Sequence, residues 1–169
     1  MDPFPDIEPP DVHYVRAAEG WLELDCPGEA AVELAQVGPS CQDHPLVLWL
    51  HCQTQSAAGE WARCARTAER LVGVLPDDPR GWIQRSYALH ELKRTREAYE
   101  LLLAGLPRFP NPPVTLPYNL ACYACQMGDQ ASAWRWLGRA QKLGGAEAIK
   151  AMALEDLDLE PLWTELRAG

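Results

Sequence analysis

Small side chains recur along this chain with a fixed period of about 34 residues. One series consists of Ala30, Cys64, Ala98 and Ala133, spaced 34, 34 and 35 residues apart. The same spacing recurs in a second series, Ala18, Cys52, Ser86 and Ala121, and in a third, Leu34, Ala68, Leu102 and Leu137. Three series with one period do not arise by chance. The pattern therefore predicts four copies of one structural unit.

Each unit is expected to hold two helices. In the third unit the apolar residues follow helical spacing twice, first at Trp82, Leu89 and Leu92 and then at Ala98, Leu101, Leu102 and Leu106. The break between the two helices carries Gly28, Gly59 or Gly128 in three units and the polar residues 93–95 in the other one, which suits a tight turn. Prolines at 39, at 76–79 and at 110–113 separate the units, because proline ends one helix and can start the next.

The small residues have a reason in packing geometry. Where two helices cross closely, a side chain larger than Ala, Ser or Cys would push the helix axes apart. One helix pair cannot cover its own apolar face, so the units are expected to stack into a continuous core. The sequence thus predicts an all-α solenoid.

Composition and charge narrow the classes of partner. The chain has 169 residues, 47% of them apolar, which is enough for a sizeable core in one domain. Its net charge is −9, with one basic and eleven acidic residues in 1–60 but twelve basic and seven acidic in 61–142. An acidic chain lacks the dominant basic field that nucleic acid requires, so no nucleic-acid partner is expected. The basic runs are interpreted as solvated helix faces, with docking of another copy's acidic end as the alternative: Arg63, Arg66 and Arg70, and Arg135, Arg139 and Lys142.

The chain is expected to be cytoplasmic. Its first dozen residues contain four prolines and several acids, and they lack the apolar core and basic flank of a signal peptide. The longest apolar stretches, 45–50 and 101–106, are far shorter than the roughly 20 residues of a membrane-spanning helix, so no membrane partner is expected. The six cysteines are interpreted as reduced thiols, mostly in the core: Cys26, Cys41, Cys52, Cys64, Cys122 and Cys125.

The period and its residues resemble the tetratricopeptide repeat, most visibly in 82–110 and 118–145. The resemblance implies a right-handed α-α superhelix with four units, at about 11–44, 45–78, 79–112 and 113–146, after a proline-rich extension at 1–10. The first unit carries an extra segment from Gly38 to Asp43, and the second has His51 and Gln55 where the family usually has larger apolar residues.

Residues 147–169 resemble the C-terminal capping helices of many bacterial members of this family, which implies a bacterial protein. A cap is required because the last unit otherwise exposes its apolar face. Its buried side is expected to contain Ala148, Ile149, Met152, Leu157, Leu162, Trp163 and Leu166.

In this family the first helix of each unit lines a concave groove that holds a peptide. Carried over by position, the groove residues are Trp49, Gln53, Arg80, Ile83, Tyr87, His90, Tyr118, Cys122, Cys125 and Gln126, and the same face includes Val15, Glu19, Leu22, Glu23 and Ser56. Such a floor, apolar and aromatic with few charges, suits a peptide with apolar anchors. The alternative is that the N-terminal dozen or the C-terminal helices cover Trp49, Tyr87 and Tyr118 from within.

The family's carboxylate clamp is not expected in this chain. The corresponding positions of the first unit are Val15 and Glu19, and of the pair in the third unit only Arg80 is basic, its neighbour being Gln84.

No catalytic or metal-binding pattern stands out. Cys122 and Cys125 form a C-x-x-C, but a zinc site needs four ligands and no second pair has a usable spacing. The histidines, His13, His44, His51 and His90, are scattered without a recognisable triad, and there is no glycine-rich phosphate loop. Neither an enzyme nor a cofactor is expected.

The sequence therefore predicts a scaffold or adaptor that binds a partner protein or peptide in the groove. A second hypothesis is a self-associating module whose acidic ends dock on the basic middle of another copy, which leaves a homodimer open. The third is an enzyme or metal-binding module built on Cys122 and Cys125.

Overall fold

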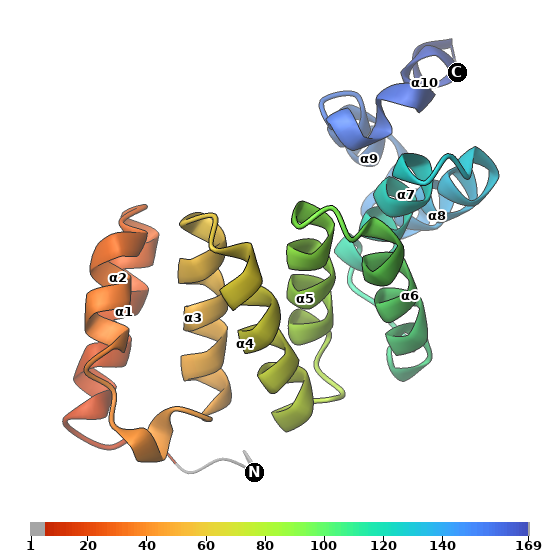
Figure 1. Ribbon diagram of the computed structural model, residues 1–169. Helices are drawn as coiled ribbons and strands as arrows, with labels where there is room; N and C mark the ends of the chain where they lie inside the picture. The colour runs from red at the N-terminus through yellow and green to blue at the C-terminus, as the bar shows by residue number, and fades with distance from the viewer. Residues whose placement is uncertain (1–5, 169) are drawn as a thin grey trace. The chain divides into compact units, whose positions relative to one another are not determined.

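The computed structural model describes residues 6–168, and these form ten α-helices, three short 3-10 segments and no strand (Figure 1). The α-helices are α1 (Asp11–Glu23), α2 (Pro27–Leu34), α3 (Pro45–Ala57), α4 (Trp61–Val74), α5 (Pro79–Glu91), α6 (Thr95–Gly105), α7 (Thr115–Gln126), α8 (Gln130–Gly144), α9 (Ala146–Ala153) and α10 (Trp163–Ala168). The 3-10 segments are η1 (Pro39–Cys41), η2 (Leu106–Arg108) and η3 (Leu157–Leu162). The predicted all-α fold is confirmed.

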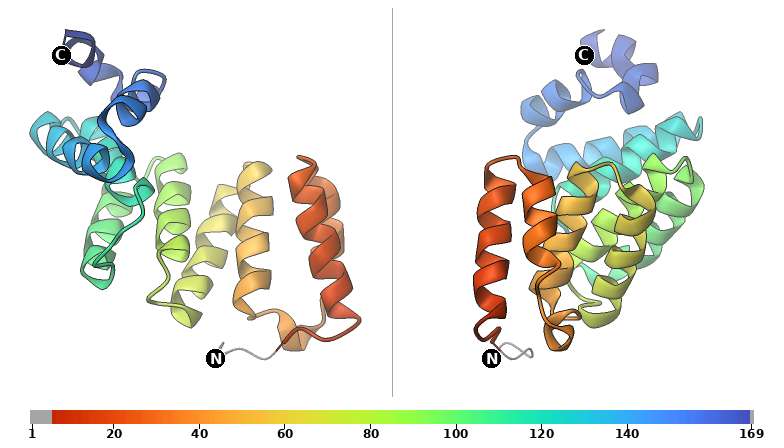
Figure 2. Two further views of the ribbon diagram at one scale, coloured as in Figure 1. Left: turned by 180° about the vertical axis from the view of Figure 1, so that it is seen from behind. Right: turned by 60° about the vertical axis from the view of Figure 1, so that its left-hand side comes forward.

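The chain forms two compact units, Met1–Ala88 and Leu89–Gly169, with the boundary inside α5. In the first unit α1 packs on α2 and α3 packs on α4, and α2 and α1 both contact α3 (Figure 2). Proline occupies the first position of α2, α3 and α5, where its missing N–H leaves no hydrogen bond unmade. The first unit is thus a layer of helix pairs.

The predicted small-residue contacts lie at the centre of both units. All twelve residues of the three periodic series have an exposed fraction of 0%. In the second helix pair the Cys64 thiol donates to the backbone oxygen of Cys52 over 3.5 Å, which shows how closely α3 and α4 approach there. A larger side chain at such a position would have to displace the facing backbone.

The extra segment between α2 and α3 is fixed at both ends. The Gly38 N–H donates to Asp11 Oδ1 over 2.9 Å, and Arg70 pairs with Asp43 over 2.6 Å. Ahead of this unit, Ile7 of the N-terminal extension packs against the first core cluster. Residues 1–5 of the extension lie outside the described residues, so the covering of the groove by the N-terminal dozen stays a prediction.

A residue in the left-handed region closes each turn between paired helices. These residues are Asp25 (φ 55°), Lys93 (φ 62°), Gly59 (φ 70°) and Gly128 (φ 81°). The expectation of Gly28 in the first turn was wrong, because this residue lies inside α2. Asp and Lys can occupy the left-handed region at a cost of about 1 kcal/mol, so glycine marks only two of the four turns.

The second unit ends in a cap that differs in detail from the expected one. Its buried residues are Ile149, Ala153, Leu159, Leu162 and Leu166, whereas Met152 is 50% and Leu157 72% exposed, and Ala148 is exposed as well. Residues 157–162 form a 3-10 segment instead of an α-helix, and its three-residue period places Leu159 and Leu162 on one side and Leu157 on another. Trp163 is half-buried, and its indole N–H donates to the backbone oxygen of Ala153 over 2.7 Å.

The packing of α8 can be tested by a matched pair of substitutions. Ala133 is fully buried and Ala131, on the same helix, is exposed. We expect Ala133→Leu to lower the free energy of unfolding by about 1–3 kcal/mol through overpacking. Ala131→Leu should change it by less than about 0.5 kcal/mol. Urea unfolding followed by circular dichroism measures both, and equal effects would contradict the close crossing of α7 and α8.

Candidate functional site

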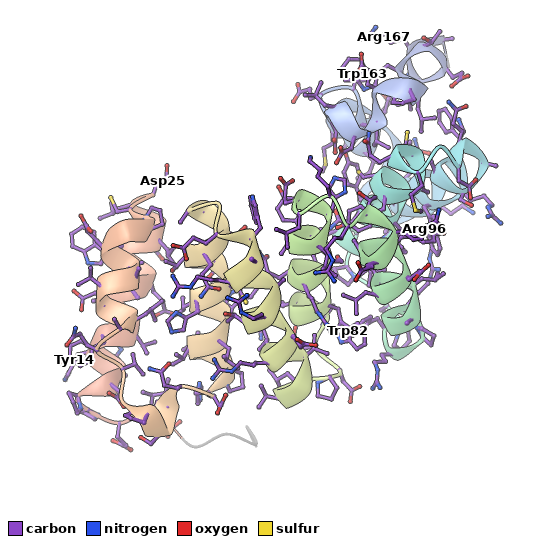
Figure 3. The ribbon with its side chains drawn as sticks, in the orientation of Figure 1. Tyr14, Asp25, Trp82, Arg96, Trp163 and Arg167 are labelled. Atoms are coloured by element: carbon purple, nitrogen blue, oxygen red, sulfur yellow. The ribbon has the colours of Figure 1, made fainter. Side chains whose placement is uncertain are left out.

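An open groove of about 580 Å³ lies on the face that α1, α3 and the start of α5 form in the first unit. Figure 3 draws the side chains of these helices as sticks. Its lining, which we call the first-unit groove, consists of Glu19, Leu22, Glu23, Leu46, Trp49, Leu50, Gln53 and Arg80. Six of these residues lie on the expected face, and Trp49, Gln53 and Arg80 are among the predicted groove residues. Val15 does not line the groove, because at 2% exposure it belongs to the core beneath.

Helical spacing explains why these side chains share a face. On α1 the lining residues are at positions 19, 22 and 23, and on α3 they are at 46, 49, 50 and 53. Residues three, four or seven apart lie on one side of a helix. Leu46 and Leu50 were not among the predicted residues, although Leu46 lies three residues before Trp49 and Leu50 three before Gln53, which is the spacing that would have identified them.

A stacked cation forms one wall of the groove. The guanidinium carbon of Arg80 lies 5.6 Å from the centre of the Trp49 ring. The same guanidinium binds Asp78 with two nitrogens, the shortest contact being 2.7 Å. Burial alone would raise the pKa of Asp78, but the hydrogen bonds and charge of Arg80 outweigh it and hold the pKa below its usual value. Arg80 thus binds Asp78 and lies over the Trp49 ring at the same time.

The groove carries more charge than expected. Glu19 and Glu23 line it from α1, and Arg80 lines it from α5. Apolar side chains of Leu22, Leu46 and Trp49 lie among these charges. A ligand suited to this lining has an apolar group beside a cation, not an apolar surface alone.

Two other predicted residues of α5, Ile83 and Tyr87, do not line this groove. Ile83 is half-buried. Tyr87 is 39% exposed and contacts Trp61 edge to face, with ring centres 5.5 Å apart and planes at 89°. Both lie in the first unit, on the helix that supplies Arg80.

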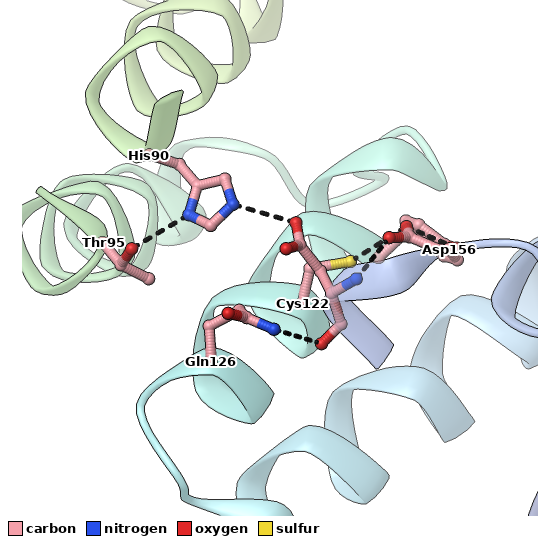
Figure 4. Close-up of polar contacts among 7 residues, drawn as sticks. His90, Thr95, Cys122, Gln126 and Asp156 are labelled. Carbon is pink, nitrogen blue, oxygen red and sulfur yellow. Dashed lines mark hydrogen bonds and ion pairs between the residues drawn. The ribbon is translucent and has the colours of Figure 1, made fainter. Parts of the chain in front are cut away.

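The predicted groove residues of the second unit are mostly covered by the chain itself. His90, Tyr118, Cys122 and Cys125 are only 4–7% exposed, while Gln126 is exposed. The segment that starts at Asp156 and continues into η3 lies over them (Figure 4). This is the covering by C-terminal residues that was the alternative for Tyr118.

Two carboxylates of this segment make the covering contacts. Asp156 accepts from the Tyr118 hydroxyl over 3.0 Å and from the Cys122 thiol over 3.5 Å. Asp158 Oδ2 lies 2.8 Å from His90 Nε2, and its backbone oxygen accepts from the Gln126 amide over 2.9 Å. The sequence carries no signal for these aspartates, because contacts across more than 30 residues follow no periodic pattern.

This covering disfavours chemistry at the cysteine pair. Burial raises the pKa of the Cys122 thiol, and the carboxylates of Asp156 and Asp158 raise it further. The same causes raise the pKa of Cys125. The thiolate, which is the form that attacks or binds a metal, is therefore rare at neutral pH. Within residues 6–168, no group of three or more His, Cys, Asp or Glu side chains is arranged to hold a metal ion.

Among the described helices, none combines the length and the apolar composition that crossing a membrane demands.

Solved structures of other proteins share the fold of this chain. No family model and no curated protein matches the chain. Among solved structures, a double mutant of MamA from strain RS-1 aligns with a TM-score of 0.72 at 12% identity, over 82% of this chain and 77% of that one. A thermophilic TPR protein from Thermus thermophilus aligns with a TM-score of 0.70 at 16% identity, over 94% and 95%. At these identities the likeness shows the fold alone, and that fold is the tetratricopeptide-repeat solenoid.

The covered face of the second unit can be tested by thiol chemistry. We expect Cys122 to react with iodoacetamide at least about ten-fold more slowly than Cys26 at pH 8, because Cys122 is buried and its pKa is raised. Mass spectrometry of peptides after timed labelling measures both rates. In denaturant the two cysteines should react alike, which serves as the control. Similar rates in the folded protein would mean that η3 does not cover α7.

Proposed function

We propose that this chain is a non-enzymatic protein-interaction module, and that the first-unit groove binds a peptide segment of a partner protein. The supporting observation is the groove itself: an open hollow with apolar side chains among Glu19, Glu23 and Arg80, on a tetratricopeptide-repeat fold. Solenoid folds of this kind offer extended surfaces to partners. The fold alone does not identify the partner, so the proposal depends on the chemistry of the lining.

The lining favours a segment with a large apolar side chain next to a lysine or arginine. Trp49 offers a broad contact area, and the Arg80 guanidinium lies over its ring. Glu19 and Glu23 are one helical turn apart and present two carboxylates to the same ligand. A basic residue pairing with them would fix the direction of the bound segment.

The proposal names Glu19, Glu23, Trp49, Gln53 and Arg80 as the principal contacts. In the second unit, a ligand of His90, Tyr118, Cys122 or Cys125 would first have to displace the segment that begins at Asp156. That displacement would expose Leu159 and Leu162, which are fully buried. The free energy lost there opposes binding at those residues.

We also propose that the module acts in the cytoplasm. Four of its cysteines, Cys52, Cys64, Cys122 and Cys125, are buried as thiols within helices. Thiols used as packing residues are typical of proteins from reducing compartments.

Self-association remains the second candidate. The acidic segment at 155–160 and the exposed arginines Arg63 and Arg70 have opposite charges. An oligomer held in this way would dissociate as the salt concentration rises. In peptide binding, salt would weaken the pairing with Glu19 and Glu23 but leave the apolar contact with Trp49.

Peptide binding can be tested without knowing the partner. From a displayed library of random peptides, we expect wild type to select sequences with an aromatic or aliphatic residue beside Lys or Arg. Against a selected peptide, Trp49→Ala should lower the affinity at least about ten-fold through lost contact area. The double variant Glu19→Gln, Glu23→Gln should lower the affinity for peptides that contain the basic residue. It should leave unchanged the affinity for versions in which that residue is replaced by Gln.

A matched control is available on α2. Glu29 and Glu33 have the same four-residue spacing but do not line the groove. Glu29→Gln, Glu33→Gln makes the same change of net charge and should leave the affinity within about two-fold of wild type. Isothermal titration calorimetry measures every variant, with circular dichroism as the check on folding. If both double variants lose affinity equally, the effect comes from net charge and the groove proposal fails.

A further inference from the structure

A second hollow of about 390 Å³ lies in the first unit, away from the first-unit groove. Its lining, the arginine pocket, consists of Gln42, His51, Gln55, Arg63, Arg66, Thr67 and Arg70. No residue is shared between the two linings. The pocket is formed by the opposite side of α3, by one face of α4, and by the connection that precedes α3.

Three arginines, all from α4, line this hollow. On α4, Arg63, Arg66 and Arg70 are three and four residues apart, so they lie on one face of the helix. Arg63 pairs with Glu60 over 2.7 Å and Arg70 with Asp43 over 2.6 Å, and all four side chains are at least 42% exposed. Ion pairs so exposed contribute about 0–1 kcal/mol and rearrange easily. Among the described residues, Arg66 has no ion pair.

The lining also includes a buried amide that lacks a partner. Gln55 is only 8% exposed, and its Oε1 atom is buried without a hydrogen bond. A buried polar group left unpaired costs about 1–3 kcal/mol. An amide can present either its oxygen or its NH₂ group after a half-turn, so Gln55 can accept from or donate to a ligand. After the half-turn, the Gln55 NH₂ group can donate to an anionic oxygen in the pocket.

His51 supplies a further donor. Burial lowers the pKa of His51, and the positive charges of Arg70 and Arg63 lower it further. The imidazole is therefore neutral at pH 7 and keeps one N–H for donation. His51 and Gln55 are one helical turn apart on α3, so both polar side chains line the same hollow.

We propose that the arginine pocket binds a phosphate monoester. A guanidinium presents N–H groups in a planar fork that matches an oxyanion. A carboxylate has two oxygens and is satisfied by one or two such forks, whereas a phosphate monoester has three terminal oxygens and two negative charges. A phosphate monoester therefore needs more hydrogen-bond donors and more positive charge than a carboxylate does. Three arginines, a neutral histidine and an amide lining one hollow can supply them.

The same phosphate chemistry has two sources: a small phosphorylated metabolite, or a phosphorylated serine or threonine of a protein. Both present the terminal oxygens that Arg63, Arg66 and Arg70 would bind. The site is independent of peptide binding in the first-unit groove, because the two linings share no residue. A negative result for phosphate binding in the arginine pocket therefore does not contradict peptide binding in the first-unit groove, and the reverse also holds.

The test uses the full chain, with backbone amide resonances as the readout. The probes are inorganic phosphate, glucose 6-phosphate, a phosphoserine peptide, and the same peptide with aspartate in place of phosphoserine. We expect phosphate and at least one of the two monoesters to shift the amides around His51, Gln55 and Arg66. Tighter binding of glucose 6-phosphate would identify a metabolite as the source, and tighter binding of the phosphopeptide would identify a protein.

Two variants distinguish binding in the arginine pocket from a general effect of net charge. Arg66→Gln should weaken phosphate-ester binding at least about ten-fold, because one charge-assisted fork is lost. Arg96→Gln, an exposed position on α6, makes the same change of net charge and should leave binding within about two-fold. The far-ultraviolet circular dichroism of both variants should match wild type. The proposal is overturned if no probe shifts these resonances, if Arg66→Gln binds like wild type, or if the aspartate peptide binds as tightly as the phosphopeptide.

Discussion

The close crossing of paired helices at small side chains is the constraint on which both units depend. Cys52 and Cys64 show it most directly, since a thiol of one helix reaches the backbone oxygen of the other. Because these residues are small, α3 and α4 approach until larger neighbours such as Leu48 and Leu71 are fully buried. Each helix then has one fixed side toward its partner. The other sides are free to carry function.

In the first unit this constraint determines which side chains remain available. With Cys52 directed at α4, the α3 residues Leu46, Trp49 and Gln53 lie on a different side, where α1 and the start of α5 complete the first-unit groove. His51 and Gln55 lie on yet another side and contribute to the arginine pocket. One helix thus contributes to two hollows of different chemistry, one apolar with acidic residues and the other basic.

In the second unit the apolar face of the last repeat must also be covered. The cap does so by packing η3 against α7. Leu159 and Leu162 bury their side chains, while Asp156 and Asp158 satisfy the polar groups of Tyr118, Cys122 and His90. The positions that form an open groove in the first unit are therefore occupied from within in the second. The same repeat pattern leads to an open face in one case and a covered face in the other.

The periodic features of this fold could be predicted from the sequence, because packing requires them in every copy. The small residues were identified correctly, and all of them are fully buried. Asp25 was missed because a left-handed turn residue need not be glycine. The expectation that Leu157 is buried was wrong: its segment is a 3-10 helix, which turns Leu157 away from the buried side. For the candidate site, Trp49, Gln53 and Arg80 line the first-unit groove as predicted by position, and their role in binding stays a prediction. The contacts of Asp156 and Asp158 depend on a single tertiary arrangement that no repeat encodes.

The most direct test of the central claim is site-specific photo-crosslinking in the native cell. A benzophenone side chain replaces Gln53 in the first-unit groove, or Gln130 at the exposed start of α8. Binding in the first-unit groove should give a discrete adduct with one partner protein from position 53, competed by a selected groove peptide, and no such adduct from position 130. The same adducts from both positions, or an adduct at position 53 that the peptide does not reduce, would contradict binding in the first-unit groove.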